Sequence, residues 1–110
     1  MNYSHIVVLI TVPSREFSEE ISHALVKDQL AACVNIIPGI FSIYQWKGGI
    51  ESDNEFLLIA KSRTALLDKI VATVKKFHPY DVPEVIALPI IAGSDDYMAW
   101  IDESTSENEA

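Results

Sequence analysis

The sequence predicts an α+β fold, a ferredoxin-like βαββαβ sandwich with a long β-hairpin and a short C-terminal helix. Three observations predict it: apolar, β-branched runs alternate with segments of helical periodicity, a glycine pair separates two long strand-like segments, and 110 residues make one domain. Two right-handed crossovers joined by a hairpin place both helices on one face of a four-stranded antiparallel sheet.

The first predicted unit is a strand followed by a helix. Residues 5–12 (HIVVLITV) are apolar and rich in β-branched side chains, which is typical of a strand buried on both faces. Ser14 can cap the helix that follows, because its side-chain oxygen can accept from a free backbone N–H. Apolar residues then recur at helical spacing, so we expect a helix from residue 15 to about residue 29.

The second predicted unit is the hairpin. Residues 33–46 have strand character that is broken at Pro38-Gly39, and residues 50–62 form the returning strand after the turn at Gly48-Gly49. Strands of this length span roughly 40 Å, longer than a small domain needs. We therefore expect residues 42–47 to project beyond the core.

Two aromatic residues lie on the projecting part of the hairpin. Exposed Tyr44 and Trp46 would suit a subunit contact or the wall of a ligand site. Ordinary packing between cross-strand aromatic side chains is the alternative.

The third predicted unit is a helix, a strand and a short final helix. Thr64 can cap the helix, and Pro79 ends it because the residue before proline avoids the helical region. Residues 85–91 form the last strand. Residues 95–101 have spacings that suit one or two helical turns.

Both faces of the predicted sheet carry apolar side chains. In the last strand Val85 and Ala87 alternate with Ile86 and Leu88, and the second strand shows the same pattern. Two helices cover only one face, so the other must be hidden against another chain. The sequence therefore predicts a homo-oligomer.

The charge of the chain excludes two classes of partner. Sixteen acidic and eight basic residues give a net charge of -8, and residues 81–110 carry acids but no bases. Nucleic acids and anionic lipid surfaces require clustered cations, so we expect neither as a partner. Residues 103–110 lack apolar periodicity, and we expect one domain over residues 1–102 followed by a disordered acidic tail.

The cellular location is predicted from absences in the sequence. A single cysteine rules out an intrachain disulfide, and the start of the chain has no basic segment followed by an apolar one. We expect a cytoplasmic protein.

The densest polar stretch between apolar elements is His78-Pro79-Tyr80-Asp81-Val82-Pro83-Glu84. An imidazole, a phenol and carboxylates on one loop could bind a cation or act as acid and base. Two prolines also suffice to make it a rigid connector. The sequence has no glycine-rich phosphate loop and no serine nucleophile motif, so we expect a protein without enzymatic activity and without an organic cofactor.

Three residues are candidates for ligand binding. Cys33 and His78 are suitable ligands for Cu(II) or another divalent cation, although a lone cysteine beside alanines also fits a small buried side chain. Lys61 follows an apolar run and can bind an anion in a cleft, or extend its ammonium from a strand end to solvent.

Three segments resemble the CutA family of divalent-cation tolerance proteins. They are residues 31–39 (AACVNIIPG), residues 42–51 (SIYQWKGGIE) and residues 78–84 (HPYDVPE). Val12-Pro13, Lys61 and the Tyr97-x-x-Trp100-Ile101 motif fit as well, so the resemblance covers about residues 6–101.

The resemblance implies a homotrimer with a role in tolerance to divalent cations, especially copper. It also implies a similarity in assembly to the PII signalling proteins, whose clefts between subunits bind small ligands. By resemblance, the residues near such clefts are Cys33, Trp46, Glu51, Lys61, His78, Tyr80, Glu84 and Tyr97. Two hypotheses follow: a trimer that binds metal through His78 and Cys33, or a PII-like sensor or scaffold without a specific metal site.

Two positions depart from some relatives in the family. Ile10 stands where they carry a cysteine, and Phe77 stands where they carry a histidine before the His-Pro-Tyr motif. Two potential metal ligands are thus missing, which would weaken a copper site that relied on them.

Overall fold

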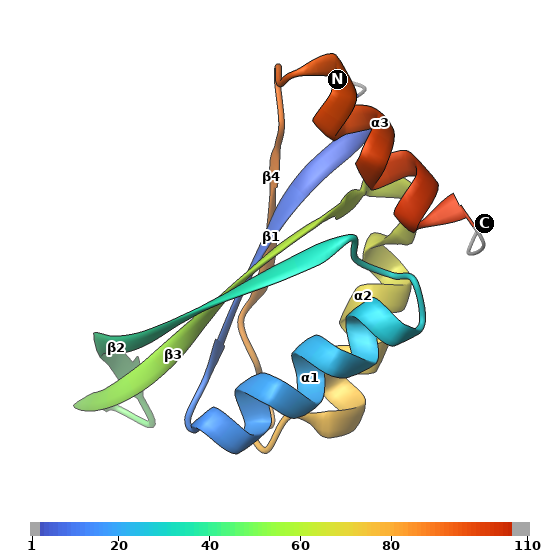
Figure 1. Ribbon diagram of the computed structural model, residues 1–110. Coiled ribbons are helices and arrows are strands. Elements are labelled where there is room, and N and C mark those ends of the chain that lie inside the picture. Colours follow the sequence, from blue (N-terminus) through green and yellow to red (C-terminus); the bar gives the residue numbers. More distant parts are fainter. Residues whose placement is uncertain (1–2, 107–110) are drawn as a thin grey trace.

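A four-stranded antiparallel sheet with the order β2-β3-β1-β4 forms the centre of the molecule (Figure 1). In the computed structural model, which describes residues 3–106, the strands are β1 (His5–Val12), β2 (Cys33–Trp46), β3 (Gly49–Arg63) and β4 (Val85–Pro89). β1 pairs with β3 on one side and with β4 on the other. This is the strand order of the predicted βαββαβ sandwich, which is confirmed.

Two helices, α1 (Arg15–Lys27) and α2 (Leu67–Phe77), contact each other and cover one face of the sheet (Figure 1). Fully buried side chains of the sheet and helices meet there and form the core; they include Val8, Ile10, Ile21, Leu25, Leu58, Ile70 and Val74. Ser14 caps α1 as predicted, since its Oγ accepts from the backbone N–H of Phe17 at 3.2 Å.

The start of the second helical segment differs from the prediction. A 3-10 turn (Thr64–Leu66) precedes α2, and its cap residue, Arg63, makes no side-chain cap. The Thr64 hydroxyl instead donates to the carbonyl oxygen of Tyr3 at 2.5 Å, so Thr64 ties this turn to the start of the chain. The helix ends at Phe77, and His78 before Pro79 is extended, as predicted.

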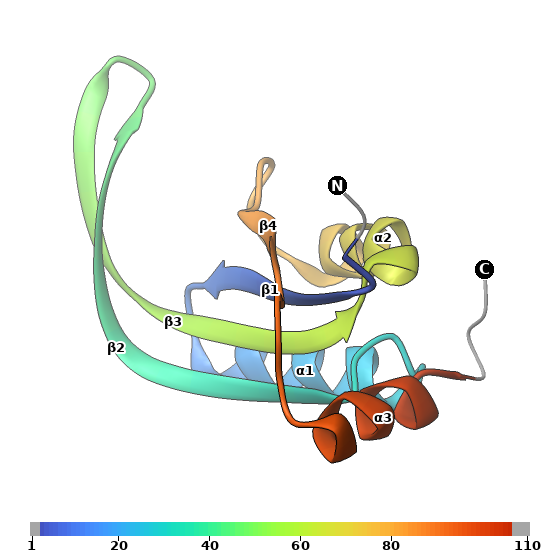
Figure 2. The ribbon, with the colours of Figure 1, turned by 90° about the horizontal axis from the view of Figure 1, so that it is seen from above.

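The hairpin is continuous, and the predicted break at Pro38-Gly39 is wrong. β2 crosses these two residues with a shift of register between Ile37 and Ile40, and Gly39 has a φ of +76°. A bulge of this kind increases bending and twist without ending the strand. Figure 2 shows the hairpin curving away from the rest of the sheet to its tip at Lys47 and Gly48, both with positive φ.

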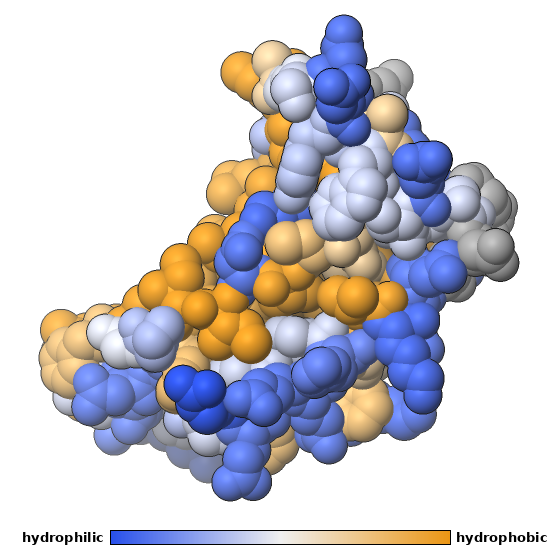
Figure 3. Space-filling view, viewed as in Figure 1, coloured by the Kyte–Doolittle hydropathy of each residue, from blue (hydrophilic) through white to orange (hydrophobic). Residues whose placement is uncertain are grey.

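The face of the sheet opposite α1 and α2 carries apolar side chains in register. Odd-numbered residues of β1 point to it and are half-buried. Leu9 lies between Ile59 and Ile86 in neighbouring strands, and Ile86 and Leu88 of β4 remain 51% and 50% exposed. We call this surface the open face; its apolar residues are Val7, Leu9, Leu57, Ile59, Ile86 and Leu88. Figure 3 shows hydrophobic surface extending in a band from the hairpin toward β4.

The last helix, α3 (Asp95–Ser104), packs near the end of β3 and extends further than expected. Thr105 directly after it is fully buried, and Arg63 donates to its Oγ1 and to its carbonyl oxygen, both at 2.8 Å. The sequence predicts that the domain ends at residue 102 and that an acidic tail follows. In the structure, residues 103–106 belong to α3 or follow directly on it, so the folded part continues past residue 102. Residues 107–110 of the expected acidic tail lie outside the described residues.

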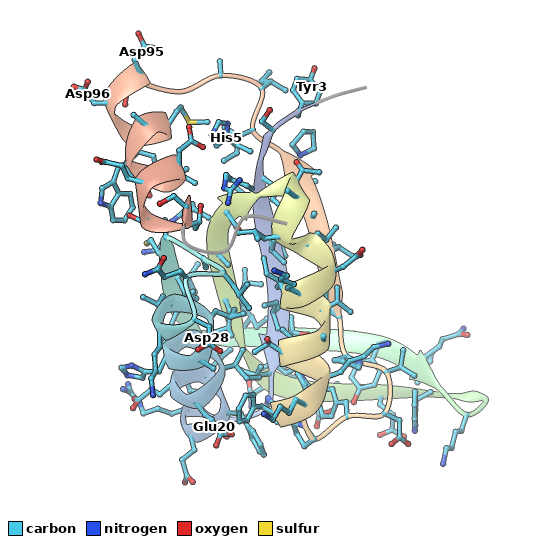
Figure 4. All side chains as sticks on the ribbon, turned by 90° about the vertical axis from the view of Figure 1, so that its right-hand side faces the viewer. Tyr3, His5, Glu20, Asp28, Asp95 and Asp96 are labelled. Atoms are coloured by element: carbon cyan, nitrogen blue, oxygen red, sulfur yellow. The ribbon has the colours of Figure 1, made fainter. Side chains whose placement is uncertain are left out.

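α3 also contacts β1 through a side-chain interaction. His5 Nε2 lies 2.8 Å from Asp102 Oδ1, and Figure 4 shows His5 next to this helix. Ile101 supplies the buried apolar contact of α3. None of the helices formed by residues 3–106 is long and apolar enough to cross a membrane.

Candidate functional site

Side chains from β2, β3 and α3 meet at one end of the open face. Cys33 and Lys61 are directly opposite each other in the β2–β3 register. Lys61 Nζ lies 3.9 Å from Cys33 Sγ and also donates to Asn35 Oδ1. The Tyr97 hydroxyl of α3 lies beside the Cys33 thiol. We call Cys33, Asn35, Lys61 and Tyr97 the thiol cluster.

Tyr97 forms the outer wall of the thiol cluster. Burial, and then the charge and hydrogen bonding of the neighbouring Cys33, raise the pKa of the Tyr97 phenol above its ordinary value. Its ring lies 5.4 Å from the ring of Trp100, centroid to centroid, at a tilt of 43°. Both rings are about two-fifths exposed, so α3 presents an aromatic surface beside the cluster.

Lys61 is the charged group of the thiol cluster. The residue is half-buried; within residues 3–106 its Nζ contacts Cys33 Sγ and Asn35 Oδ1 and forms no ion pair with a carboxylate. A partly desolvated cation without a counter-charge attracts anions and repels metal ions. The cluster therefore favours an anionic ligand.

His78 is held within its own chain, at the other end of β1. Its Nε2–H donates to the carbonyl oxygen of Thr11 at 2.7 Å, and its Nδ1 accepts from the backbone N–H of Tyr80 at 3.1 Å. The imidazole is 8% exposed. Both ring nitrogens are occupied in a way that matches one neutral tautomer, so neither offers a lone pair to a metal.

A second group of polar side chains lies where the hairpin leaves the core. The Tyr80 hydroxyl donates to Glu55 Oε2 at 2.8 Å, and the Tyr44 hydroxyl donates to Asp53. Glu55 is only 6% exposed. We call Tyr44, Asp53, Glu55 and Tyr80 the tyrosine–carboxylate cluster.

Both tyrosines of this cluster hold their protons more tightly than an isolated phenol. The hydrogen bond to Asp53 raises the pKa of Tyr44 to about 12. Burial, followed by the hydrogen bond and charge of Glu55, raises the pKa of Tyr80. Each phenol thus remains a donor to its carboxylate over the whole physiological range.

The residues predicted to hold a metal do not fit one within a single chain. Cys33 and His78 lie apart on the sheet. The pair Cys33–Lys61 lies level with Val7 of β1, whereas His78 bonds to Thr11, four strand positions or about 13 Å further along β1. In the described part of the chain, no three His, Cys, Asp or Glu side chains are grouped to hold an ion. Cys33 also lies next to the Lys61 ammonium, which opposes a second cation.

The other predicted cleft residues lie apart. Trp46 is 45% exposed near the hairpin tip, with Lys47 Nζ 5.8 Å from its ring centroid. Glu51 faces Tyr44 across the hairpin, and Glu84 is exposed just before β4. Among residues 3–106, none of the three forms a hydrogen bond or ion pair through its side chain to either cluster.

Reasoning from the sequence missed Glu55 and Asn35. Glu51, Asp53 and Glu55 occupy every second position of β3. This spacing places three acidic side chains on one face of the strand, and it could have indicated Glu55 from the sequence. Asn35 had no comparable signal, because its role follows from its position two residues from Cys33 on the same face of β2.

Comparisons with known proteins agree with this structure. Residues 6–104 match the family model described as CutA1 divalent ion tolerance protein. The chain is 52% identical over 99 residues to the divalent-cation tolerance protein CutA of Thermus thermophilus, covering 90% of this chain and 96% of that protein. It is 53% identical over 100 residues to the chloroplastic protein CutA of Arabidopsis thaliana, covering 91% of this chain but 55% of that longer protein.

A solved structure shows the same fold. The structure of the divalent cation tolerance protein Cut A1 from Thermus thermophilus superposes with a TM-score of 0.90 at 50% identity, over 92% of this chain and 98% of the other. The family-model match over residues 6–104 includes both clusters and α3. The chain belongs to the CutA1 family of divalent ion tolerance proteins.

Proposed function

We propose that this member of the divalent-cation tolerance family works as a homotrimer that binds a small anionic ligand in clefts between its subunits. The observation that carries the proposal is the open face: apolar and in register over three strands, it ends at the Lys61 ammonium. The role is one of binding, without a catalytic step.

The apolar part of the open face supports assembly. Ile86 and Leu88 each leave about half of their side chains in water, next to Leu9 and Val7. Each square ångström of apolar surface that a second copy covers contributes roughly 25 cal/mol. Phe41, Ile43 and Ile50 are further exposed apolar residues of the hairpin, but the register places them on the strand face opposite to the open-face residues.

The polar end of the open face supports the ligand class. Lys61 supplies an uncompensated positive charge, Asn35 an amide and Tyr97 with Trp100 an aromatic wall. Small-ligand sites combine apolar walls with a few such polar groups. A second subunit that packs on the open face would cover the solvent-exposed side of this site.

Assembly is tested by native mass spectrometry and light scattering. We expect a species of three 12.3 kDa chains at micromolar concentration. Leu88→Glu should convert it to monomers, because a carboxylate would be buried at the interface. Val26→Glu places the same charge on an exposed apolar residue of α1 and should leave the trimer intact. A monomeric parent chain would contradict the proposal.

Ligand binding is tested by thermal-shift measurements with a panel of nucleotides and small carboxylates. We expect stabilisation by at least one anion, which Lys61→Ala removes and Lys69→Ala, an exposed lysine of α2, retains. A panel without any stabilising anion would count against this ligand class.

Metal binding between subunits is the second candidate function, favoured by the Cys33 thiol on the open face. Calorimetry with Cu(II) and Zn(II) tests it. Binding that Cys33→Ser abolishes and His78→Ala retains would support a site made by several subunits. Loss of binding in His78→Ala alone, with the fold intact, would instead restore His78 as a ligand.

A further inference from the structure

The pairing of Cys33 with Lys61 places a thiol and an amine within reach of a covalent bond. The two residues are cross-strand neighbours, a position in which β-carbons lie about 5 Å apart, and Lys61 Nζ is 3.9 Å from Cys33 Sγ. Asn35 on the same strand face holds the amine in place. No movement of the backbone is needed to bring nitrogen and sulfur together.

We propose that Cys33 and Lys61 form a reversible sulfur–nitrogen cross-link when the protein meets a hydroperoxide. In the first step, hydrogen peroxide oxidises the thiol by two electrons to a sulfenic acid and is itself reduced to water. In the second step, Lys61 loses a proton and its nitrogen attacks the sulfenic sulfur. An S–N bond forms, the S–O bond breaks, and the hydroxyl group leaves as water with the second nitrogen proton.

The surroundings of the pair favour this product over its competitors. The chain has one cysteine, so the sulfenic acid has no thiol partner within the subunit. Tyr97 lies beside the sulfur, and Cys33 is only partly exposed, which hinders attack by a thiol from solution. The Lys61 amine is the near nucleophile, and sulfenic acids are known to condense with protein nitrogen.

The cross-link would change the proposed site. It converts the Lys61 ammonium into a neutral nitrogen and removes the free thiol in one event. This consequence rests on the proposed function, whereas formation of the cross-link does not. A hydroperoxide would thereby release an anion from the cleft, and two equivalents of a small thiol would restore both side chains.

The test is peptide mapping and intact mass measurement of the full chain treated with hydrogen peroxide. We expect a product lighter by about 2 Da, from the loss of two hydrogens. Trypsin should release residues 28–47 joined to residues 48–63, because the modified Lys61 is no longer cleaved. Dithiothreitol should return the parent mass.

Three variants complete the test. Lys61→Arg and Cys33→Ser should both lack the joined peptide, while Lys69→Arg should form it as the parent does. Products about 32 or 48 Da heavier at Cys33, a disulfide between two chains, or an unmodified thiol would each overturn the proposal. These outcomes are measured on the parent chain, so a variant that fails to fold does not affect the test of cross-link formation. Anion binding measured before and after oxidation separately tests the consequence.

Discussion

The Nε2 atom of His78 lies 2.7 Å from the carbonyl oxygen of Thr11, and this bond joins the loop after α2 to the end of β1. The same imidazole accepts from the backbone of Tyr80, whose hydroxyl then reaches Glu55. One histidine thus sets the path of the loop that leads into β4. Its position in the His-Pro-Tyr motif is explained by this connection without any metal.

Removing the His78 side chain should therefore reduce stability. His78→Ala removes the imidazole partner of the part-buried Thr11 carbonyl and of the Tyr80 backbone N–H, at a cost of about 1–3 kcal/mol in the free energy of unfolding. Urea denaturation measures it. His23→Ala, on the exposed surface of α1, should change stability by less than about 0.5 kcal/mol. Equal stabilities of the two variants would show that the His78 bonds are not formed.

Alkaline pH should weaken the hairpin through Tyr44. Its folded-state pKa of about 12 lies above the ordinary value of 10, so the protonated phenol stabilises the fold. That contribution is fully present below about pH 10 and is lost as the pH rises through about 12. Ultraviolet titration of tyrosinate should show the late titration in the parent chain. In Asp53→Asn, which removes the charged acceptor, one tyrosine should titrate earlier; an unchanged curve would contradict the contact.

Thr105 should be necessary for the docking of α3. Thr105→Val keeps the shape of the side chain but removes the acceptor for Arg63 Nε and the donor to the Ile101 carbonyl. We expect a loss of about 1–3 kcal/mol and faster hydrogen exchange in residues 95–105. Ser106→Ala, which removes an exposed hydroxyl bonded to Glu103, is the control and should leave exchange unchanged.

Gly39 should be required for its backbone conformation rather than for space. Apart from Gly39 and its two chain neighbours, no described atom lies within 4 Å of the place where a β-carbon would stand, yet the φ of +76° disfavours any other side chain. Gly39→Ala should cost roughly 1–2 kcal/mol. Gly49→Ala is the matched control in the same hairpin, since its β-carbon would make an ordinary 3.8 Å contact and its φ is not in the left-handed region. Similar thermal stabilities would contradict this account.

The sheet and the two core helices could be predicted because their signals are local. The run of residues 5–12 and the helical spacing after Ser14 depend only on neighbouring residues, and both elements lie where the sequence predicts them. Thr64 shows the limit of this approach. Its hydroxyl had a backbone partner 61 residues away, at Tyr3, which replaced the expected cap.

Only part of the candidate site, the identity of some of its residues, could be predicted. Cys33, Lys61 and Tyr97 were each singled out, but their convergence depends on the β2–β3 register and on where α3 docks. Glu55 is buried because the loop at Tyr80 folds over it from 25 positions along the chain. Long-range packing of this kind leaves no periodicity in the sequence.

The strand order also determines when the open face can exist. β4 pairs only with β1 within the described residues, so Leu88 meets Val7 across 81 positions of the chain. A chain still emerging from the ribosome, or one cut before Val85, lacks Ile86 and Leu88, two of the six apolar residues of that surface. For the proposed trimer, this order means that self-association would wait until folding joins the two ends of the domain, and incomplete chains would be kept out of it.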